Sequence, residues 1–159
     1  MNSRVDILPA TPDDADALTR IAFAAKRYWG YPESWIQHWR DSLTITREFV
    51  RNNGVYAAVS GSGPCAFYAL TGAGELELEH LWVSPGWIGS GVGRLLFEHA
   101  MREAARRGAS AVAIEADPNA EGFYLRMGAR RIGENIYEIE GRKRKLPLLT
   151  VDLSKPVEG

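Results

Sequence analysis

Apolar and charged residues alternate from 75 to 79 at the start of the stretch 75–83, which reads Glu-Leu-Glu-Leu-Glu-His-Leu-Trp-Val. A period of two is typical of a strand that buries one face. Glycines follow, and Leu95, Leu96 and Ala100 then recur with the period of a helix. The pattern therefore predicts a strand, a glycine loop and a helix over 94–107 in direct succession. The charged residues of this helix are expected to face outward: Glu98, Arg102, Glu103, Arg106 and Arg107.

The residues before this strand predict one short strand followed by three helices. The first helix begins where Thr11 provides a cap, Pro12 takes the first helical position and two aspartates face the positive end of the helix dipole. The aromatic stretch 29–32 interrupts the helical pattern. The expected spans are 5–8 for the strand and 11–27, 33–40 and 46–51 for the helices.

The remaining elements complete a mixed sheet. Two strands are joined by the stretch 61–64, Gly-Ser-Gly-Pro, which is a hairpin signal. A helix connects the strand that ends at Val83 to a buried strand at 111–115, so these two strands are expected to be parallel. A short helix, capped by Asp117 or Asn119, precedes a last antiparallel pair. The expected spans are 55–59, 65–70, 132–139 and 148–153 for strands and 120–127 for the short helix, with a loose tail from Ser154.

The glycine loop between the central strand and helix has the chemistry of an anion site. Gly89, Gly91 and Gly93 carry no Cβ, so their N–H groups can turn toward one ligand. The helix that follows opens with unpaired N–H groups, and its dipole favours negative charge. We therefore expect the loop to bind a phosphate or pyrophosphate.

Two common glycine-loop classes do not fit this loop. A P-loop needs Lys-Ser or Lys-Thr after its glycines, and neither follows here. A dinucleotide fingerprint counted from Gly89 needs a glycine where Arg94 stands. A third pattern, [RQ]-x-x-G-x-[GA] between a strand and a helix, is matched at Gly91 and Gly93, although Ile88 stands where Arg or Gln is usual.

A second segment strengthens this match. Residues 117–129, Asp-Pro-Asn-Ala-Glu-Gly-Phe-Tyr-Leu-Arg-Met-Gly-Ala, are similar to N-x-x-A-x-x-[FY]-Y-x-x-x-G-[FA], shortened because Asn119 and Ala120 are adjacent. The strand that ends at 81–85 precedes both motifs in the expected order. With these features the chain resembles the Gcn5-related N-acetyltransferase (GNAT) family, bacterial type, over about 5–153.

The resemblance implies an α/β fold with a mixed, mostly antiparallel sheet, helices on both faces and one parallel pair splayed around the coenzyme. It implies acetyl-CoA as cofactor and CoA as product. The pantetheine arm is then expected between the strands 77–83 and 111–115, and the pyrophosphate on the loop backbone. The implied coenzyme-binding residues are Leu81, Trp82, Val83, Ile88, Gly89, Ser90, Gly91, Val92, Gly93, Arg94, Asn119, Phe123, Tyr124 and Arg126.

Glu75, Glu77 and Glu79 share one face of the central strand. They could form a solvated face only, or supply a general base, because an alkylamine is protonated at neutral pH and must lose a proton before it attacks. The resemblance favours Glu77 as the base and places Glu79 beside the acceptor. His80 is a rival base, since imidazole titrates near neutral pH, although alternation turns it to the other face unless a bulge intervenes.

Tyr124 has two interpretations. It could pack in the core with its neighbour Phe123, or it could protonate the departing thiolate, because phenols and thiols have comparable unperturbed pKa values. The resemblance implies direct attack of the amine on the thioester, without a covalent intermediate. It also implies that a strand N–H near Val83 stabilises the oxyanion.

Three aromatic residues between the first helices, Trp29, Tyr31 and Trp35, could pack in a loop or wall an acceptor pocket, and in the GNAT family this region covers the acceptor. The basic run 142–145 is expected to be a solvated turn, with an acidic acceptor or coenzyme phosphates as the alternative ligand. Cys65 is expected to be a small buried hydrophobic residue.

Composition limits the function classes. A length of 159 residues fits one domain, 1–159, with its core at about 5–153. The net charge of −1 argues against a general nucleic-acid binder. One cysteine excludes an internal disulfide and fits the cytoplasm. No apolar run is long enough to span a membrane, and the stretch 1–6 lacks the apolar core of a signal peptide. The spacing of His, Cys and Asp residues does not fit a metal site.

The sequence therefore predicts a cytoplasmic, acetyl-CoA-dependent N-acetyltransferase acting on a primary amine of an unidentified small, partly apolar acceptor. A homodimer is left open. The alternative is a CoA-binding sensor or regulatory module without turnover, against which the presence of Glu77 and Tyr124 argues. A hydride-transfer enzyme with a nicotinamide cofactor is disfavoured by the failed fingerprint.

Overall fold

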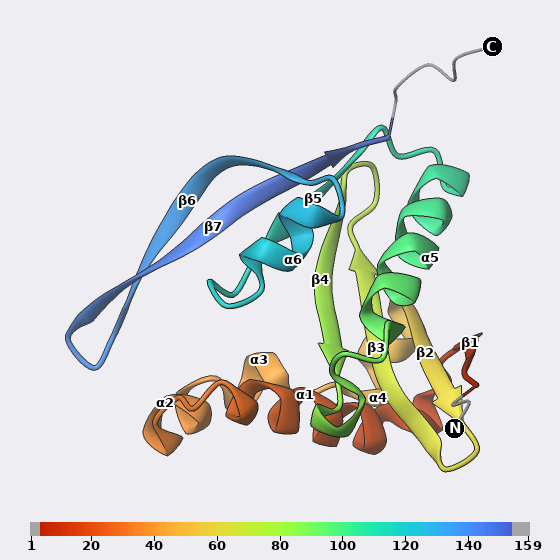
Figure 1. The fold of residues 1–159 in the computed structure, drawn as a ribbon, viewed down its shortest axis with the longest axis horizontal. Helices are drawn as coiled ribbons and strands as arrows, with labels where there is room; N and C mark the ends of the chain where they lie inside the picture. Colours follow the sequence, from red (N-terminus) through yellow and green to blue (C-terminus); the bar gives the residue numbers. More distant parts are fainter. Residues whose placement is uncertain (1–3, 154–159) are drawn as a thin grey trace. The chain divides into compact units, whose positions relative to one another are not determined.

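A computed structural model describes residues 4–153 of the chain (Figure 1). Within these residues the chain forms two compact units. The first unit contains the chain up to Ala69 together with His80–Phe97, and the second contains Leu70–Glu79 and the chain from Glu98 onward. The polypeptide thus passes from one unit to the other several times, so residues distant in sequence lie together within each unit.

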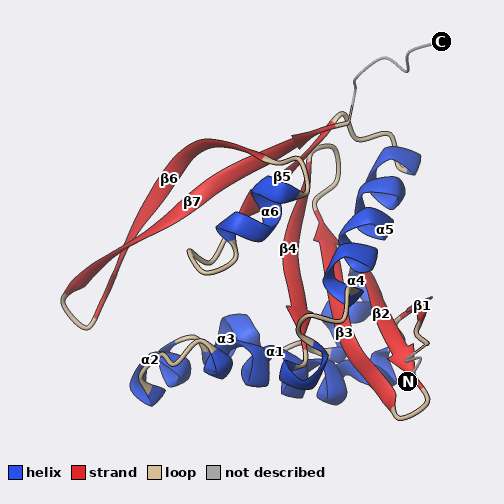
Figure 2. Cartoon of the chain, viewed as in Figure 1, coloured by secondary structure: helices blue, strands red, loops and turns tan. Residues whose placement is uncertain are grey.

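Seven strands form one mixed sheet (Figure 2). The strands are β1 (Asp6–Pro9), β2 (Gly54–Ser60), β3 (Gly63–Thr71), β4 (Leu76–Val83), β5 (Ala111–Glu115), β6 (Arg130–Ile139) and β7 (Arg142–Asp152). Their order is β1-β2-β3-β4-β5-β7-β6. β4 and β5 are parallel, whereas β1 with β2, β5 with β7 and β6 with β7 are antiparallel. The predicted mixed sheet and its parallel pair are confirmed.

The helices follow the predicted order with one difference. They are η1 (Pro12–Asp14), α1 (Ala15–Tyr28), α2 (Glu33–His38), α3 (Arg40–Leu43), α4 (Arg47–Asn52), η2 (Pro85–Trp87), α5 (Val92–Arg106) and α6 (Glu121–Arg126). The single helix predicted over 33–40 is two helices, because the backbone of Trp39 leaves the helical region at φ −91° and ψ 8°. The loose tail predicted from Ser154 lies outside the described residues.

Two predicted helix starts can be compared. Thr11 N–H donates to Asp14 Oδ2 at 2.8 Å, so the start of the first helical segment is capped as predicted. The predicted cap of α6 is wrong. Ala120 is the cap residue there, without a side-chain hydrogen bond, and Asp117 Oδ1 instead accepts the N–H of Asn119 at 2.8 Å.

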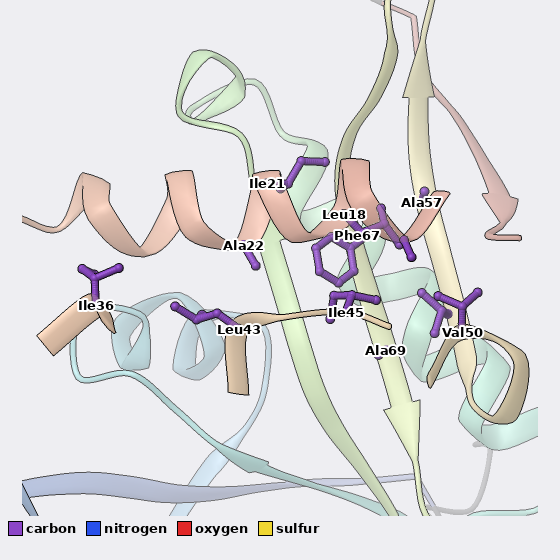
Figure 3. Packing of buried hydrophobic residues seen from close by; sticks show 12 residues of the cluster. Leu18, Ile21, Ala22, Ile36, Leu43, Ile45, Val50, Ala57, Phe67 and Ala69 are labelled. Carbon is purple, nitrogen blue, oxygen red and sulfur yellow. The ribbon is translucent and has the colours of Figure 1, made fainter. Parts of the chain in front are cut away.

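The core of the first unit lies between α1 and the sheet (Figure 3). Leu18 and Ala22 of α1 are fully buried, as is Phe67 of β3, and burial of a large apolar side chain is worth roughly 1.5–3 kcal/mol. Thr19 and Ile45 exchange two hydrogen bonds, of 3.1 and 2.8 Å, which fasten the chain before α4 to α1. Four aromatic residues discussed below are packed against this core: Tyr31, Trp39, Phe49 and Trp82.

Helix α5 buries a different stripe from the predicted one. Leu96 and Ala100 are buried as expected, but Leu95 is 48% exposed. Glu103, predicted to face outward, is buried. Its carboxylate accepts hydrogen bonds from Arg106 at 2.5 Å and from Arg107 at 2.8 Å, which offset the cost of burying a charge. The bond from Arg106 lowers the pKa of Glu103 to about 2.

Strands β6 and β7 form a long, twisted hairpin (Figure 1). The predicted solvated turn at 142–145 is wrong, because these residues belong to β7. Ile139 pairs with Arg142, so the turn consists only of Glu140 and Gly141, both with positive φ, 50° and 77°. Two residues with positive φ make a hairpin turn whose twist matches that of the strands.

Candidate functional site

Strand β4 presents two different faces. Leu76, Leu78 and His80 are buried, whereas Glu77 and Glu79 are exposed. The predicted alternation therefore holds through His80, which lies on the opposite face from the glutamates. Beyond it, Leu81, Trp82 and Val83 are all half-buried.

His80 belongs to the interior of the first unit. Its side chain is only 7% exposed, and its ring lies 5.6 Å from that of Phe49 and 6.1 Å from that of Phe67. The indole Nε1–H of Trp82 donates to His80 Nδ1 at 3.0 Å. Because Nδ1 accepts this bond, a neutral His80 carries its proton on Nε2.

In the second unit, β4 and β5 pair over a short distance only. The register joins Leu76 to Val112 and Glu77 to Ala113. Glu79 on β4 and Glu115 on β5 lie two residues further along, and these described residues do not continue the ladder. Beyond Glu77 and Ala113, the backbone N–H and C=O groups of β4 and β5 are thus not paired with each other.

Glu115 lies on the same sheet face as Glu77, because it is two residues beyond Ala113, the register partner of Glu77. Two side chains of β6 fix its carboxylate. Asn135 Nδ2–H donates to Glu115 Oε2 at 2.5 Å, and the Tyr137 hydroxyl donates to the same oxygen at 2.6 Å. Sequence reasoning missed these residues, because only the pairing of β5, β7 and β6 brings them together.

The carboxylates on this face influence one another. Although Glu77 reaches solvent, partial burial of its carboxyl group raises its pKa, and the negative charges of Glu79 and Glu115 raise it further. The hydrogen bond to Glu115 raises the pKa of the Tyr137 hydroxyl, and burial adds to this effect. Glu77 is thereby a stronger base than an isolated glutamate, which suits a group that must take a proton from an ammonium.

The glycine loop has the expected open backbone. Gly89 and Gly91 have positive φ, 85° and 92°, and a Cβ at either position would meet no atom within 4 Å. Among residues 4–153, the N–H groups of Gly89, Gly91 and Gly93 take part in no hydrogen bond. Ser90 is held by its own hydroxyl, which donates to the carbonyl of Trp87 at 2.6 Å.

Several predicted loop residues surround these glycines. Ile88 is 45% exposed, and Val92, the first residue of α5, is buried. Arg94 lies in the first turn of α5 and is exposed. Helix α5 is 15 residues long, so its dipole adds to the field of the unpaired N–H groups at its start.

Helix α6 carries the predicted acid. Tyr124 is buried, whereas Phe123 is half-buried and Arg126 is exposed. Burial raises the pKa of Tyr124 well above its ordinary value, and the charge of Asp117 raises it further. Asn119 is exposed and donates through Nδ2 to Asp117 Oδ1 at 3.0 Å.

The predicted aromatic cluster of the first unit is real but differently composed. Tyr31 and Trp35 stack, with ring centroids 5.9 Å apart, and Trp39 contacts both rings edge-on. Trp29 lies apart from them and packs against Tyr28. Sequence reasoning missed Trp39, although its spacing of four from Trp35 is a helical signal.

Sequence reasoning also missed Lys26, whose ammonium group lies beside this cluster. The side chain of Lys26 is 9% exposed, and its Nζ lies 4.2 Å from the ring centroid of Trp39, 5.0 Å from Tyr31 and 5.9 Å from Trp82. These rings stabilise an ammonium through their negative faces. The cluster already contains a cation of the chain itself.

The model of the acetyltransferase (GNAT) family matches residues 16–129, well over half of the chain. The chain belongs to the GNAT family. The peptidyl-lysine N-acetyltransferase YjaB of Salmonella typhimurium is 28% identical, over 75% of this chain and 89% of that protein.

Solved GNAT structures share the fold. A Gcn5-related N-acetyltransferase from Rhodopseudomonas palustris superposes with a TM-score of 0.79 at 22% identity, covering 96% of this chain and 99% of that one. The PaiA N-acetyltransferase of Thermoplasma acidophilum, solved in complex with coenzyme A, gives 0.75 at 16% identity, covering 94% and 99%.

These comparisons confirm the predicted family, fold and activity. The protein is a GNAT N-acetyltransferase that depends on acetyl-CoA. Across residues 4–153, no helix is both long and apolar enough to cross a membrane. The same residues contain no group of three His, Cys, Asp or Glu side chains arranged to hold a metal ion.

Proposed function

We propose that the protein transfers an acetyl group from acetyl-CoA to a primary amine by direct attack, as one acetyltransferase domain. Glu77 takes the proton of the acceptor ammonium, directly or through water. Tyr124 donates to the departing sulfur, and the N–H of Val83 stabilises the oxyanion. The family match runs through both units, which supports the assignment to one domain.

The observation that carries this proposal is the glycine loop. Three N–H groups within five residues, those of Gly89, Gly91 and Gly93, are unused by hydrogen bonds of the described residues, and they lie at the start of a long helix. Positive φ and the open space beside Gly89 and Gly91 suit backbone that approaches a ligand closely. Such a loop is suited to the pyrophosphate of the coenzyme.

The short parallel ladder supports the position of the pantetheine arm. After Glu77 and Ala113 the facing edges of β4 and β5 have backbone groups that need other partners. The amide groups of pantetheine can supply them, near Leu81 and Val83. The remaining coenzyme contacts are assigned to Trp82, Ile88, Ser90, Val92, Arg94, Asn119, Phe123 and Arg126.

The choice of Glu77 over His80 as base rests on their surroundings. Glu77 lies on the exposed face of β4, and its raised pKa makes it a stronger proton acceptor. His80 is buried against two phenylalanine rings, and its Nδ1 already accepts a hydrogen bond from Trp82. A base must reach the acceptor, and Glu77 is the more accessible of the two groups.

The role of Tyr124 follows from its protonation. Because burial and Asp117 raise its pKa, Tyr124 keeps its hydroxyl proton throughout the accessible pH range. Its pKa then exceeds that of an ordinary thiol, so complete proton transfer to the thiolate is uphill. Tyr124 therefore acts chiefly by donating a hydrogen bond to the sulfur as negative charge develops there, without transferring its proton completely.

The acceptor is proposed to carry an unhindered primary amine. The relative YjaB is described as a peptidyl-lysine N-acetyltransferase, so a lysine side chain is the first acceptor to test. Glu79 and the rings of Tyr31 and Trp35 are the proposed acceptor contacts. Trp29, apart from that cluster and 41% exposed, is the least supported of the predicted set.

Ligand-dependent stability tests the coenzyme site. Acetyl-CoA and CoA are expected to raise the melting temperature, whereas NAD and ATP raise it much less, because a ligand that binds only the native state stabilises it by mass action. Gly91→Val should remove the CoA shift, because valine disfavours positive φ and its side chain fills the cradle.

Gly86→Val is the matched control, because Gly86 lies in the preceding η2, has no positive φ and has no atom within 4 Å of its Cβ position. It should keep the CoA shift. An equal shift with NAD, or an unchanged CoA shift in Gly91→Val, would overturn the site. Release of free thiol from acetyl-CoA in the presence of an amine panel then separates the enzyme from a CoA-binding sensor, which would bind without turnover.

A further inference from the structure

The basic run of β7 contains one residue that differs from its neighbours. Lys143 and Lys145 are exposed, but the side chain of Arg144 points to the other face of the hairpin and is only 12% exposed. Arg144 Nη2 lies 3.3 Å from Asp117 Oδ2, whose side chain is 9% exposed. This pair joins β7 to the loop between β5 and α6.

Asp117 organises that loop. Its Oδ1 accepts the backbone N–H of Asn119 at 2.8 Å, and its own carbonyl accepts the N–H of Ala120 at 2.8 Å. The carbonyl of Ala120 in turn accepts the N–H of Tyr124 at 3.2 Å. The carboxylate of Asp117 thus shapes the loop, and a separate pair of backbone hydrogen bonds leads from the carbonyl of Asp117 through Ala120 to the backbone of Tyr124.

Asp117 is also the charge that acts on Tyr124, whose pKa it raises together with burial. The other charged groups nearby are already engaged or exposed. Glu121 of α6 pairs with Arg131 of β6 at 3.3 Å, and Arg126 is exposed. A nearly buried carboxylate needs a counter-ion, and Arg144 supplies it from across the hairpin.

We propose that Arg144 is a positioning residue for Tyr124: by neutralising Asp117 it keeps the hydroxyl of Tyr124 a strong hydrogen-bond donor. Without Arg144, the carboxylate of Asp117 would resist any negative charge on the phenol and weaken donation to the sulfur. This inference rests on the proposed role of Tyr124 in the acetyl transfer. It assigns a function to Arg144, the residue of the basic run 142–145 that is not exposed.

Three variants test the inference kinetically. Arg144→Ala should lower kcat about tenfold, with little change in the KM for acetyl-CoA. Addition of Asp117→Asn should restore most of this loss, because asparagine keeps the Oδ1 acceptor for Asn119 and removes the charge. Lys143→Ala is the matched control on the same strand and should keep the rate of the unaltered protein. Melting temperatures identify any variant that fails to fold, and Arg144→Gln replaces Arg144→Ala in that case.

A spectroscopic titration measures the same coupling without activity. Difluorotyrosine incorporated at position 124 has a much lower pKa than tyrosine and can be titrated by absorbance. Its pKa should rise in Arg144→Ala and fall back when Asp117→Asn is added. An unmoved pKa, or a kcat loss that Asp117→Asn does not restore in a folded protein, would overturn the inference.

The two readouts distinguish this inference from the proposed function. If the titration behaves as expected but Tyr124→Phe retains full kcat, the coupling is supported and the assignment of Tyr124 as the acid is wrong. If Tyr124→Phe loses activity and Arg144→Ala changes neither kcat nor the titration, the acid is supported and the positioning role of Arg144 is wrong.

Discussion

The two units hold their buried polar groups by different means. In the first unit, the ammonium of Lys26 lies among the rings of Trp39, Tyr31 and Trp82, and His80 lies between Phe49 and Phe67. In the second unit, Glu115 and Asp117 are held by hydrogen bonds and an ion pair from β6 and β7. Aromatic packing fixes the polar groups of one unit, and polar side chains fix those of the other.

This difference separates stability from chemistry. A group enclosed by rings has lost contact with water and resists a change of charge, so it serves the fold. A carboxylate held by donors from another strand keeps its charge and transmits it to neighbours such as Glu77 and Tyr124. We therefore expect substitutions in the polar network to change the rate first, and substitutions in the aromatic cluster to change the stability first.

The largest effect on rate is expected at Tyr124. Tyr124→Phe should lower kcat roughly ten- to a thousandfold, because the ring volume stays while the donor to the sulfur is lost. Since the pKa of Tyr124 is raised, the hydroxyl is protonated in the whole accessible range, and the loss should be the same at every pH. Pre-steady-state measurement of the chemical step checks this. An unchanged chemical step would make Tyr124 a packing residue.

A smaller loss is expected at Glu77. Glu77→Gln should lower kcat/KM for the amine about a hundredfold, with CoA affinity nearly unchanged, because glutamine keeps the shape and removes the basic oxygen. The acidic limb of the pH–rate profile should disappear. His80→Ala should instead lower the melting temperature, since it removes a buried ring that contacts Phe49 and Phe67 and accepts a hydrogen bond from Trp82. If His80→Ala removes the limb and Glu77→Gln does not, the base is His80.

The sequence predicted the elements well where periodicity alone decides the structure. The alternation in the first part of β4, the first helical segment and the strand–loop–helix order depend on residues close in sequence, and all are found. Two errors also arose among residues close in sequence, where side-chain pairing and turn geometry outweigh the apolar pattern. Glu103 is buried, where two arginines of the same helix pair with it, and β7 begins at Arg142 because Glu140 and Gly141 form a two-residue turn.

The candidate site shows a second limit, which is set by contacts between residues distant in sequence. Motif residues such as Gly91 and Tyr124 could be chosen from local spacing. The partners of the carboxylates could not, because Asn135, Tyr137 and Arg144 reach Glu115 or Asp117 only after β5, β7 and β6 have paired in register. Lys26 was missed for a related reason: a lysine on an amphipathic helix is usually solvated, and here the rings of Tyr31, Trp39 and Trp82 lie around its ammonium group.

A stability effect is expected at Lys26. Lys26→Met should lower the free energy of unfolding by about 1–2 kcal/mol, because methionine keeps the apolar stem and loses the cation that the rings stabilise. Arg20→Met is the control, since Arg20 lies on the same helix and is exposed. Urea denaturation measures both variants. If Lys26→Met leaves the stability unchanged and raises the KM for the amine, the cluster binds the acceptor. The conclusion that aromatic packing in the first unit serves stability would then be wrong.

The smallest effect is expected at Glu115, and it tests whether the polar network acts on the base. Burial is the largest cause of the raised pKa of Glu77, followed by the charges of Glu79 and Glu115. Glu115→Gln removes one of these charges while glutamine can still accept a hydrogen bond. The pKa of Glu77 should therefore fall, and Tyr137 should lose most of the cause that raises its own pKa.

The sign of the kinetic change follows from the role of Glu77. The base works when deprotonated, so kcat/KM falls as the pH drops through the pKa of Glu77. A lower pKa moves this acidic limb to lower pH, and the plateau rate should change by about threefold or less, because rate depends weakly on base strength. Glu79→Gln should move the pKa of Glu77 in the same direction and further. Carbon-detected NMR titration of the glutamate carboxyls measures both variants in the free protein. If the pKa of Glu77 shifts in the NMR titration but the acidic limb of the pH–rate profile does not, the charges on this face are coupled and another group is the base. If the pKa of Glu77 does not shift in Glu115→Gln, Glu115 has no influence on Glu77 and only stabilises the sheet.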